Sequence, residues 1–396
     1  MITLSDADLF DRVRLFHPYT GLDLVFGRTA VRSDAFSSSS ASGDQQVIIG
    51  AAAGFDDHDV RRRARGELIE RTGNILNGRA AEQRADVIAS YHELRRAGRP
   101  AVDPVQWADA PASSDPRGMR MMWVEAESLT GDGHVLVPAS VVFLHHRPPA
   151  GCGMLLRATS AGLSAHTGRD PAIAHALLEV LERDLLWRAW YSGESRPAPV
   201  DLEPSPPLRR VLAALELDHT LLAVSPNDDL WCVIACLHRP DRTEQTFGAK
   251  CMIPVDSRSW HKAVEAALLE AVMVRWSMTS PVAVRAWQRF QASGGDRSPE
   301  NPLEHALLAY HERDGLAELL GIAREESVGP SATTERKDTP TLAQDIAALT
   351  GQDVLFVDTT APAPSQYGMS VARVVAPGAR RLPTAEPTAD RPHPFG

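Results

Sequence analysis

The stretch from Thr159 to Tyr191 reads TSAGLSAHTGRDPAIAHALLEVLERDLLWRAWY. Its first ten residues are mostly small and hydroxyl-bearing, which predicts a loop that a ligand can approach closely. From Asp170 onward the apolar residues recur at helical spacing. With Asp170 as N-cap and Pro171 in the first turn, the pattern predicts a helix over residues 170–191. That helix carries Glu179, Glu182 and Arg183 in the order E-x-x-E-R.

The same acidic pattern occurs earlier, on a second predicted helix. ARGELIER (residues 64–71) contains Glu67, Glu70 and Arg71, again as E-x-x-E-R. Residues three apart share one helix face, and four carboxylates brought together repel one another unless cations neutralise them. Carboxylate oxygens suit Mg2+, and the arginine after each pair is placed to contact a phosphate or hold a glutamate. A single E-x-x-E-R is more often a salt-bridged surface, so the preceding loop decides the interpretation.

The loop before the second acidic helix has the composition of an anion site. Its glycines leave room for a phosphate near backbone N–H groups, at the start of a helix. An anion-binding loop followed by an acidic face and an arginine is the order expected for a nucleotide bound through Mg2+. Neither G-x-x-x-x-G-K-[ST] nor G-x-G-x-x-G after a strand occurs, so any ATP site is of another kind. The loop residues concerned are Ser160, Gly162, Ser164, Thr167 and Gly168.

The composition is that of a globular protein, with 43% hydrophobic and 23% charged residues. The net charge of −10 argues against a general nucleic-acid binder, whose surface is usually basic. No apolar run approaches the ~20 residues that cross a bilayer, and the N-terminus lacks a signal-peptide core. We therefore expect a soluble cytoplasmic protein without nucleic-acid or membrane partners. The cysteines lack zinc spacing and are expected to be buried free thiols: Cys152, Cys232, Cys236 and Cys251.

Helical and β-type periodicities alternate along the chain, which predicts the α/β or α+β class with helices packed on mixed sheets. Further helices are expected over residues 59–77, 208–217, 260–278 and 282–291. Strands are expected over 134–145, 353–357 and 369–375, with a hairpin formed by 230–238 and 245–254. Surface loops are expected over 33–44, 194–207 and 325–340, and an extended tail from Pro383 to Gly396.

Six blocks in order resemble the YcaO family, whose members use ATP to activate a backbone amide of a peptide. They are FHPYTGLDLVFG (16–27), ARGELIER (64–71), ATSAGLSAHTGRDPAIAHALLEVLERD (158–184), FGAKC with AALLEAVMVR (247–251, 266–275), VDTT with VARVVAPGARRL (357–360, 371–382) and RPHPFG (391–396). The resemblance implies a YcaO-like fold, with residues 1–382 as the YcaO domain and 383–396 as a proline-rich tail.

The resemblance also implies a site. ATP is expected between the acidic helices, with Mg2+ ions joining its phosphates to Glu67, Glu70, Glu179 and Glu182. By the resemblance, Arg183 and Arg275 are expected to contact phosphates, and Ser164 and Thr167 to lie near the nucleotide. The residue pattern itself adds Arg71 as a phosphate contact and Ser160 in the loop. The terminal carboxylate of Gly396 is the candidate base. This chain departs from the family where Ala161 replaces a frequent Asn and Pro171 a frequent Glu, and both positions bear on metal ligation.

The activity implied is ATP-dependent cyclodehydration, which converts Cys, Ser or Thr of a ribosomally made precursor peptide to an azoline. Bottromycin-type macroamidine formation and thioamide formation use the same activation, and the sequence leaves them open. A non-catalytic scaffold that binds a peptide or a partner is the alternative from another class. Azoline-forming members often act with a separate leader-peptide-binding protein, and such a partner and a possible homodimer are left open here.

Overall fold

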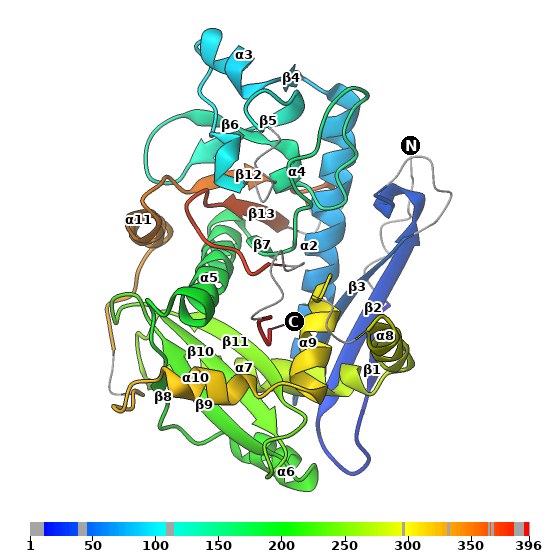
Figure 1. The fold of residues 1–396 in the computed structure, drawn as a ribbon, viewed down its shortest axis with the longest axis vertical. Coiled ribbons are helices and arrows are strands. Elements are labelled where there is room, and N and C mark those ends of the chain that lie inside the picture. Colours follow the sequence, from blue (N-terminus) through cyan, green and yellow to red (C-terminus); the bar gives the residue numbers. More distant parts are fainter. Residues whose placement is uncertain are drawn as a thin grey trace.

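The computed structural model describes residues 12–38, 46–107, 115–294, 298–330, 333–362, 365, 368–383 and 392–395. Three sheets are formed by these residues, and helices pack on and between them (Figure 1). Neighbouring strands within each sheet run antiparallel. The predicted fold class is confirmed: of the two classes expected, α/β or α+β, the antiparallel sheets correspond to α+β. Within the described ranges, no helix is both long and apolar enough to cross a membrane.

The first sheet supports the first acidic helix. Its strands are β1 (Arg14–Phe16), β2 (Val25–Ser33) and β3 (Gln46–Gly54), in that order. A short 3-10 turn, η1 (Asp34–Phe36), follows β2. Helix α2 (Asp57–Arg84) packs along β3 and contains the predicted helix 59–77. Its N-cap is Asp56, whose side chain accepts a hydrogen bond from the N–H of Asp59.

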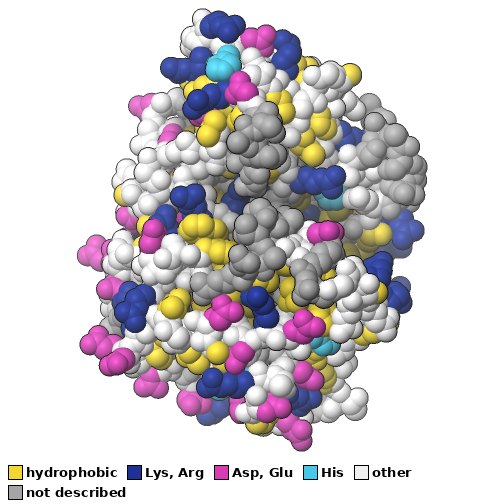
Figure 2. Space-filling model, in the orientation of Figure 1, with side chains coloured by type: hydrophobic (Ala, Val, Ile, Leu, Met, Phe, Trp, Pro, Cys, Tyr) yellow, Lys and Arg dark blue, Asp and Glu magenta, His cyan; other side chains and the backbone are white. Residues whose placement is uncertain are grey.

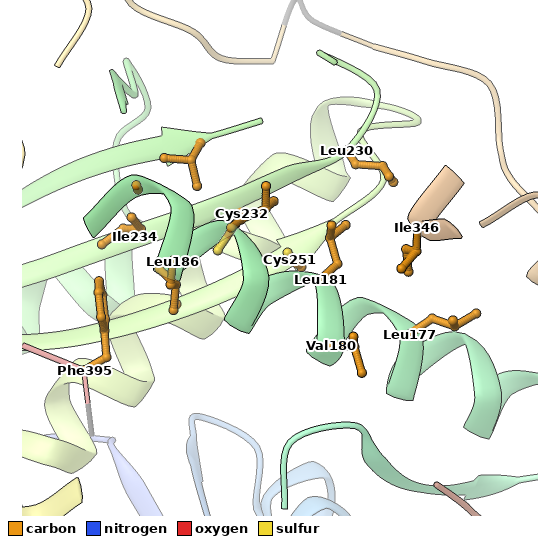
Figure 3. Close-up of a cluster of buried hydrophobic side chains, with 14 of the residues drawn as sticks. Leu177, Val180, Leu181, Leu186, Leu230, Cys232, Ile234, Cys251, Ile346 and Phe395 are labelled. Atoms are coloured by element: carbon orange, nitrogen blue, oxygen red, sulfur yellow. The ribbon is translucent and has the colours of Figure 1, made fainter. Parts of the chain in front are cut away.

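The second sheet contains the predicted hairpin and has the order β11-β10-β9-β8. The strands are β8 (Ala198–Pro199), β9 (Asp218–Val224), β10 (Trp231–His238) and β11 (Thr246–Met252). All of β10 is buried, because alternate side chains face helices on opposite sides of the sheet. Trp231, Val233 and Ala235 pack with α7 (Ser257–Met278). Cys232, Ile234 and Cys236 pack with α5 (Arg169–Trp187), as Figure 3 shows for Cys232 and Ile234.

The third sheet has the order β4-β5-β12-β13-β7, with β6 paired to β5. Its strands are β4 (Val87–Ala89), β5 (Met121–Ser128), β6 (His134–Pro138), β7 (Leu163–Thr167), β12 (Leu355–Asp358) and β13 (Met369–Val375). Helix α5 packs on β13 and β7. The smaller elements around this sheet are α3 (Tyr91–Arg96), η2 (Pro104–Trp107) and α4 (Ala139–Val142).

The remaining helices surround this frame. They are η3 (Arg188–Ser192, a π-helical turn), α6 (Pro206–Ala214), α8 (Pro281–Ala292), α9 (Pro302–His311), α10 (Gly315–Gly321) and α11 (Thr339–Thr350). Figure 2 shows Lys and Arg side chains gathered at the top of this face, where Figure 1 places α3 and β4, and Asp and Glu concentrated over its lower half. The negative net charge is therefore unevenly distributed on this face.

Four local predictions are corrected by the structure. The presumed loop before the second acidic helix contains strand β7, because residues 163–167 pair with β13. Asp170 lies inside the first turn of α5 and does not cap it, since the N-cap is Gly168. The strand predicted over 134–145 ends at Pro138, after which α4 begins. The last four residues of the predicted helix 170–191 form part of the wider turn η3.

The C-terminal tail is partly a core element. Pro392 to Phe395 are buried, although the sequence predicts an extended tail. Phe395 is 3% exposed and its ring makes edge contacts with Trp190 and Phe247, at centroid distances of 6.5 and 5.8 Å. Figure 3 shows Phe395 against the same core as Leu186 and Ile234. Burial of Phe395 together with the other three residues offsets entropy lost in ordering this segment.

Candidate nucleotide and metal site

The structure brings the two predicted pairs of glutamates together, from α2 and α5, and adds Glu270 from α7. Burial, Glu179 and Glu67 raise the pKa of Glu70 well above its usual value. Burial raises the pKa of Glu179 to about 7, with Glu182 contributing in the same direction against Arg183. Burial, with Glu182, raises the pKa of Glu270 to about 6. The five glutamates therefore form one cluster with an excess of negative charge.

Glu67 and Arg71 are held by the free edge of β3. The N–H of Ala51 donates to Glu67 Oε2 at 2.6 Å, and Arg71 Nη1 donates to the carbonyl of Ile49 at 2.9 Å. The two side chains also form an ion pair at 2.6 Å, one helical turn apart. β3 is an edge strand, so these bonds satisfy backbone groups that no neighbouring strand reaches. Part of the first E-x-x-E-R motif thus has a structural role.

Glu182 and Glu270 occupy the equivalent edge of β11. The N–H of Cys251 donates to Glu182 Oε2 at 3.0 Å, and the N–H of Ala249 donates to Glu270 Oε2 at 2.9 Å. Both donors lie on the same side of β11, which is also an edge strand. The acidic site is therefore built between the free edges of two sheets, with Glu67, Glu182 and Glu270 each fixed by a backbone N–H.

The two strand–helix pairs are built alike, around a glycine. A Cβ on Gly50 would clash with the carbonyl of Ala64 in α2, and one on Gly248 would clash with that of Ala267 in α7. In both cases the following alanine donates its N–H to the glutamate three residues after that carbonyl. The absent side chain lets helix and strand backbones approach, so that the carboxylate reaches the strand.

Glu70 and Glu179 have no hydrogen-bond or ion-pair partner among the described residues, and Glu179 acts electrostatically on Glu70. No three His, Cys, Asp or Glu side chains in the described ranges already converge on a metal-sized point. Mg2+ usually takes one or two carboxylates and completes its shell with water and phosphate oxygens. A set of facing carboxylates with raised pKa values therefore fits Mg2+ shared with a polyphosphate, which would supply the missing positive charge and oxygen ligands.

Three cationic groups border the glutamates. The pKa of Arg183 is raised overall. Burial acts to lower this pKa, but the nearby Glu182, Glu270 and Glu179 raise it by more. Glu182 and Glu179 likewise raise the pKa of Lys250 against burial. Burial lowers the pKa of Arg373 to about 10, opposed by Glu179. These cations compensate part of the acidic charge and offer contacts for phosphate.

The other predicted residues lie in varied settings. Arg275 does not pair with the glutamates: it donates to the carbonyl of Glu244 at 2.7 Å, forms an ion pair with that carboxylate, and stacks over Tyr310. Ser164 is buried on β7, whereas Thr167 is exposed with its hydroxyl 3.2 Å from His166 Nδ1. Ser160 and Arg183 line one cavity of about 130 Å³. Gly396 lies outside the described residues.

Gly162 is required by the backbone at this point. Its φ of +80° is rarely adopted by other residues, and a Cβ would lie 2.6 Å from the carbonyl of Val374. Because Val374 N–H donates to the carbonyl of Gly162 at 2.8 Å, this close approach ties the predicted loop to β13.

Sequence reasoning missed Glu270, Lys250 and Arg373 as site residues. All three lie inside the blocks that resemble the YcaO family, AALLEAVMVR, FGAKC and VARVVAPGARRL. Each is a single charged residue in an apolar stretch that pattern analysis places in a core helix or strand. That isolation was the available signal, since a charge on a buried face needs a partner or a function.

Solved structures share this fold. A heterocyclase in complex with substrate and cofactor matches 93% of this chain and 49% of its own, with TM-score 0.67 and 19% identity. YcaO from Methanopyrus kandleri, bound with AMPPCP and Mg2+, matches 93% of this chain and 86% of its own, with TM-score 0.56 and 22% identity. The heterocyclase TruD matches 82% of this chain and 46% of its own, with TM-score 0.55 and 18% identity. The chain thus spans about half the length of the two heterocyclases.

A curated relative covers a smaller part. An uncharacterized protein of Methanothermobacter thermautotrophicus is 44% identical over 89 residues, which is 22% of this chain and 22% of that protein. The profile of a family described as "YcaO cyclodehydratase, ATP-ad Mg2+-binding" matches residues 51–380, which include all five glutamates of the site. The chain belongs to the YcaO family.

Proposed function

We propose that this chain is an ATP- and Mg2+-dependent cyclodehydratase that converts Cys, or Ser or Thr, of a ribosomally synthesised precursor peptide to an azoline. Membership of the family and the fold shared with heterocyclases support the reaction class. The observation that carries the proposal is the pair Glu70 and Glu179. These two carboxylates have raised pKa values and form no hydrogen bond or ion pair among the described residues, so the neighbouring arginines and lysine leave part of their charge for a bound cation to neutralise.

The proposed metal ligands are Glu67, Glu70, Glu179 and Glu182, with Glu270 added. Bound Mg2+ would neutralise the triphosphate and hold its γ-phosphate toward the peptide. Arg183 contacts a phosphate, and Ser160, Ser164 and Thr167 remain in the proposed nucleotide shell. Arg71 and Arg275 also belong to it, and each must exchange a protein partner, Ile49 or Glu244, to reach a phosphate.

The proposed chemistry starts at the substrate side chain. Its thiol or hydroxyl adds to the carbonyl carbon of the preceding amide and loses its proton, for which the Gly396 carboxylate is the proposed acceptor. The carbonyl oxygen takes the γ-phosphoryl group of ATP, and ADP leaves. Loss of phosphate and of the amide proton then forms the C=N bond. The site serves mainly to position reactants and balance charge, because phosphorylation supplies the leaving group.

The nucleophile is what distinguishes the alternative products. A backbone amine would give a macroamidine, and sulfide would give a thioamide, after the same phosphorylation. We favour azoline formation because the chain has a proline-rich tail, with residues 1–382 as the proposed catalytic domain. A separate leader-peptide-binding protein is the proposed partner, and a homodimer and a cytoplasmic location belong to the same proposal.

The test is release of ADP after Mg-ATP and a candidate precursor peptide are added, with and without the proposed partner. We expect ADP release to depend on the peptide, and loss of one water from the peptide. Glu182→Gln should abolish turnover, while Glu125→Gln, an exposed glutamate on β5, should not. No turnover by the wild-type chain with its cognate peptide and partner would favour the scaffold alternative. Tandem mass spectrometry separates azoline from amidine, and a thioamide shows exchange of oxygen for sulfur.

A further inference from the structure

A second charged feature shares Arg183 with the acidic site. A cavity of about 50 Å³ is bounded by α5, β13, the segment before β7 and the segment after β13. Arg183, Arg373, Arg380 and Arg381 line it, and no Asp or Glu is among the described residues that do so. Its other walls include Trp107, Thr159 and the aliphatic side chains of Val141 and Val180, so the arginines are the charged side chains that a ligand would contact in a largely apolar space.

Arg373 is the buried member of this set. It is 5% exposed, and its Nη1 donates to the carbonyls of Thr159 and Ala161, both at 2.8 Å, while Nη2 donates to that of Val141 at 2.7 Å. Its Nε is buried without a hydrogen-bond partner. Glu179 and Glu70 act on this guanidinium electrostatically, but no carboxylate of the described residues hydrogen-bonds to it. The unpaired Nε donor of this buried cation therefore leaves a place for a further anionic partner.

The remaining arginines extend from the buried to the exposed side. Arg183 is partly buried and lies 3.9 Å from Glu182, so it borders both the acidic site and this cavity. Arg380 and Arg381 are exposed, and the Arg380 guanidinium stacks over Trp187 at 5.1 Å. The backbone N–H of Arg380 donates to Asp184 at 2.8 Å, which anchors this segment to α5. The cavity is therefore lined by two exposed arginines, one partly buried arginine and one buried arginine.

We infer that this cavity, which we name the arginine cavity, binds a tetrahedral oxyanion, with inorganic phosphate as its ligand. A water molecule needs roughly 10–15 Å³ of such volume, so 50 Å³ has room for about four oxygen-sized positions. Guanidinium groups offer paired donors that match phosphate oxygens. That the phosphate is the product leaving the acidic site rests on the proposed function, but phosphate binding itself does not.

The experiment measures binding of inorganic phosphate to the full chain without ATP, Mg2+ or peptide. Calorimetric titration at constant ionic strength, with chloride as the balancing anion, should show one phosphate per chain. Arg381→Gln and Arg373→Lys should each weaken binding about ten-fold or more, as expected for one charge-assisted hydrogen bond lost. Arg95→Gln on α3 removes one exposed positive charge elsewhere and should change the affinity less than two-fold.

Glu182→Gln separates this inference from the proposed metal site. It should leave phosphate binding in place, because the arginine cavity needs no metal, even though it should abolish turnover. Arg381 is exposed, so its variant keeps the test valid if Arg373→Lys fails to fold. The inference is overturned if no binding is detected at a phosphate concentration on the order of 10 mM, which is ten times an ordinary millimolar cellular level. It is also overturned if Arg95→Gln weakens binding as much as Arg381→Gln does, which would mark an adventitious ion only.

Discussion

Replacement of Glu179 by Gln should stabilise the metal-free protein at pH 8 and leave its stability at pH 5 nearly unchanged. The folded state raises the pKa of Glu179 from 4.5 to about 7, so between these values the folded state binds more protons than the unfolded state. Stability therefore falls as the pH rises through this window, and the cost is complete above pH 7. A shift of this size corresponds to at most ~3 kcal/mol, and coupling to Glu70 and Glu182 makes about 1–3 kcal/mol the expected gain.

The assay is urea unfolding in EDTA at pH 5 and pH 8, with Glu125→Gln as the matched exposed control. Wild type and Glu179→Gln should differ at pH 8 and converge at pH 5, while the control follows wild type at both values. Adding Mg2+ with a non-hydrolysable ATP analogue at 100 times its Kd should then stabilise wild type by ~2.7 kcal/mol, and the variant by less. A variant that is equally or less stable than wild type at pH 8 would refute the argument that Glu179 carries an uncompensated charge.

Three further outcomes are expected. Gly248→Ala should lower stability by about 2–4 kcal/mol in chemical unfolding, because its Cβ would clash with α7, whereas Gly321→Ala, with open space around it, should cost little. Phe395→Ala should lower stability by about 3 kcal/mol and expose the tail to carboxypeptidase; unchanged protection would contradict docking of the tail. The Mg2+ affinity for the site should fall as the pH drops below about 7, because protons compete for Glu179, and a pH-independent affinity in calorimetry would count against this carboxylate as a ligand.

The elements predicted best are those whose signal is local. The periodicity of residues 260–278 predicts α7, and the apolar runs around Cys232 and Cys251 predict the β10–β11 hairpin, both confirmed. β7 was missed because SAHT lacks apolar alternation, and its strand conformation comes from pairing with β13. The sequence predicts only an extended tail at Pro392–Phe395, because the partners of Phe395, Trp190 and Phe247, are distant in sequence.

The same distinction applies to the site. The repeated E-x-x-E-R motif and the family resemblance predicted two glutamate pairs, and the structure places these four carboxylates in one electrostatic cluster. Spacing does not reveal Glu270, because no second acid lies near it on its helix face and its role depends on the edge of β11. Nor does it reveal that Arg275 pairs with Glu244, from a turn between β10 and β11.

The central claim is that glutamates from α2 and α5 hold one Mg-ATP between them, and calorimetric titration with a non-hydrolysable ATP analogue tests it most directly. The account predicts one analogue per chain, bound only with Mg2+, and at least about ten-fold weaker binding in Glu70→Gln and in Glu179→Gln. Combining the two should cost less than the sum of their separate effects, because both variants remove ligands of one shared site. Binding without Mg2+, or binding unchanged by both replacements, would contradict the claim.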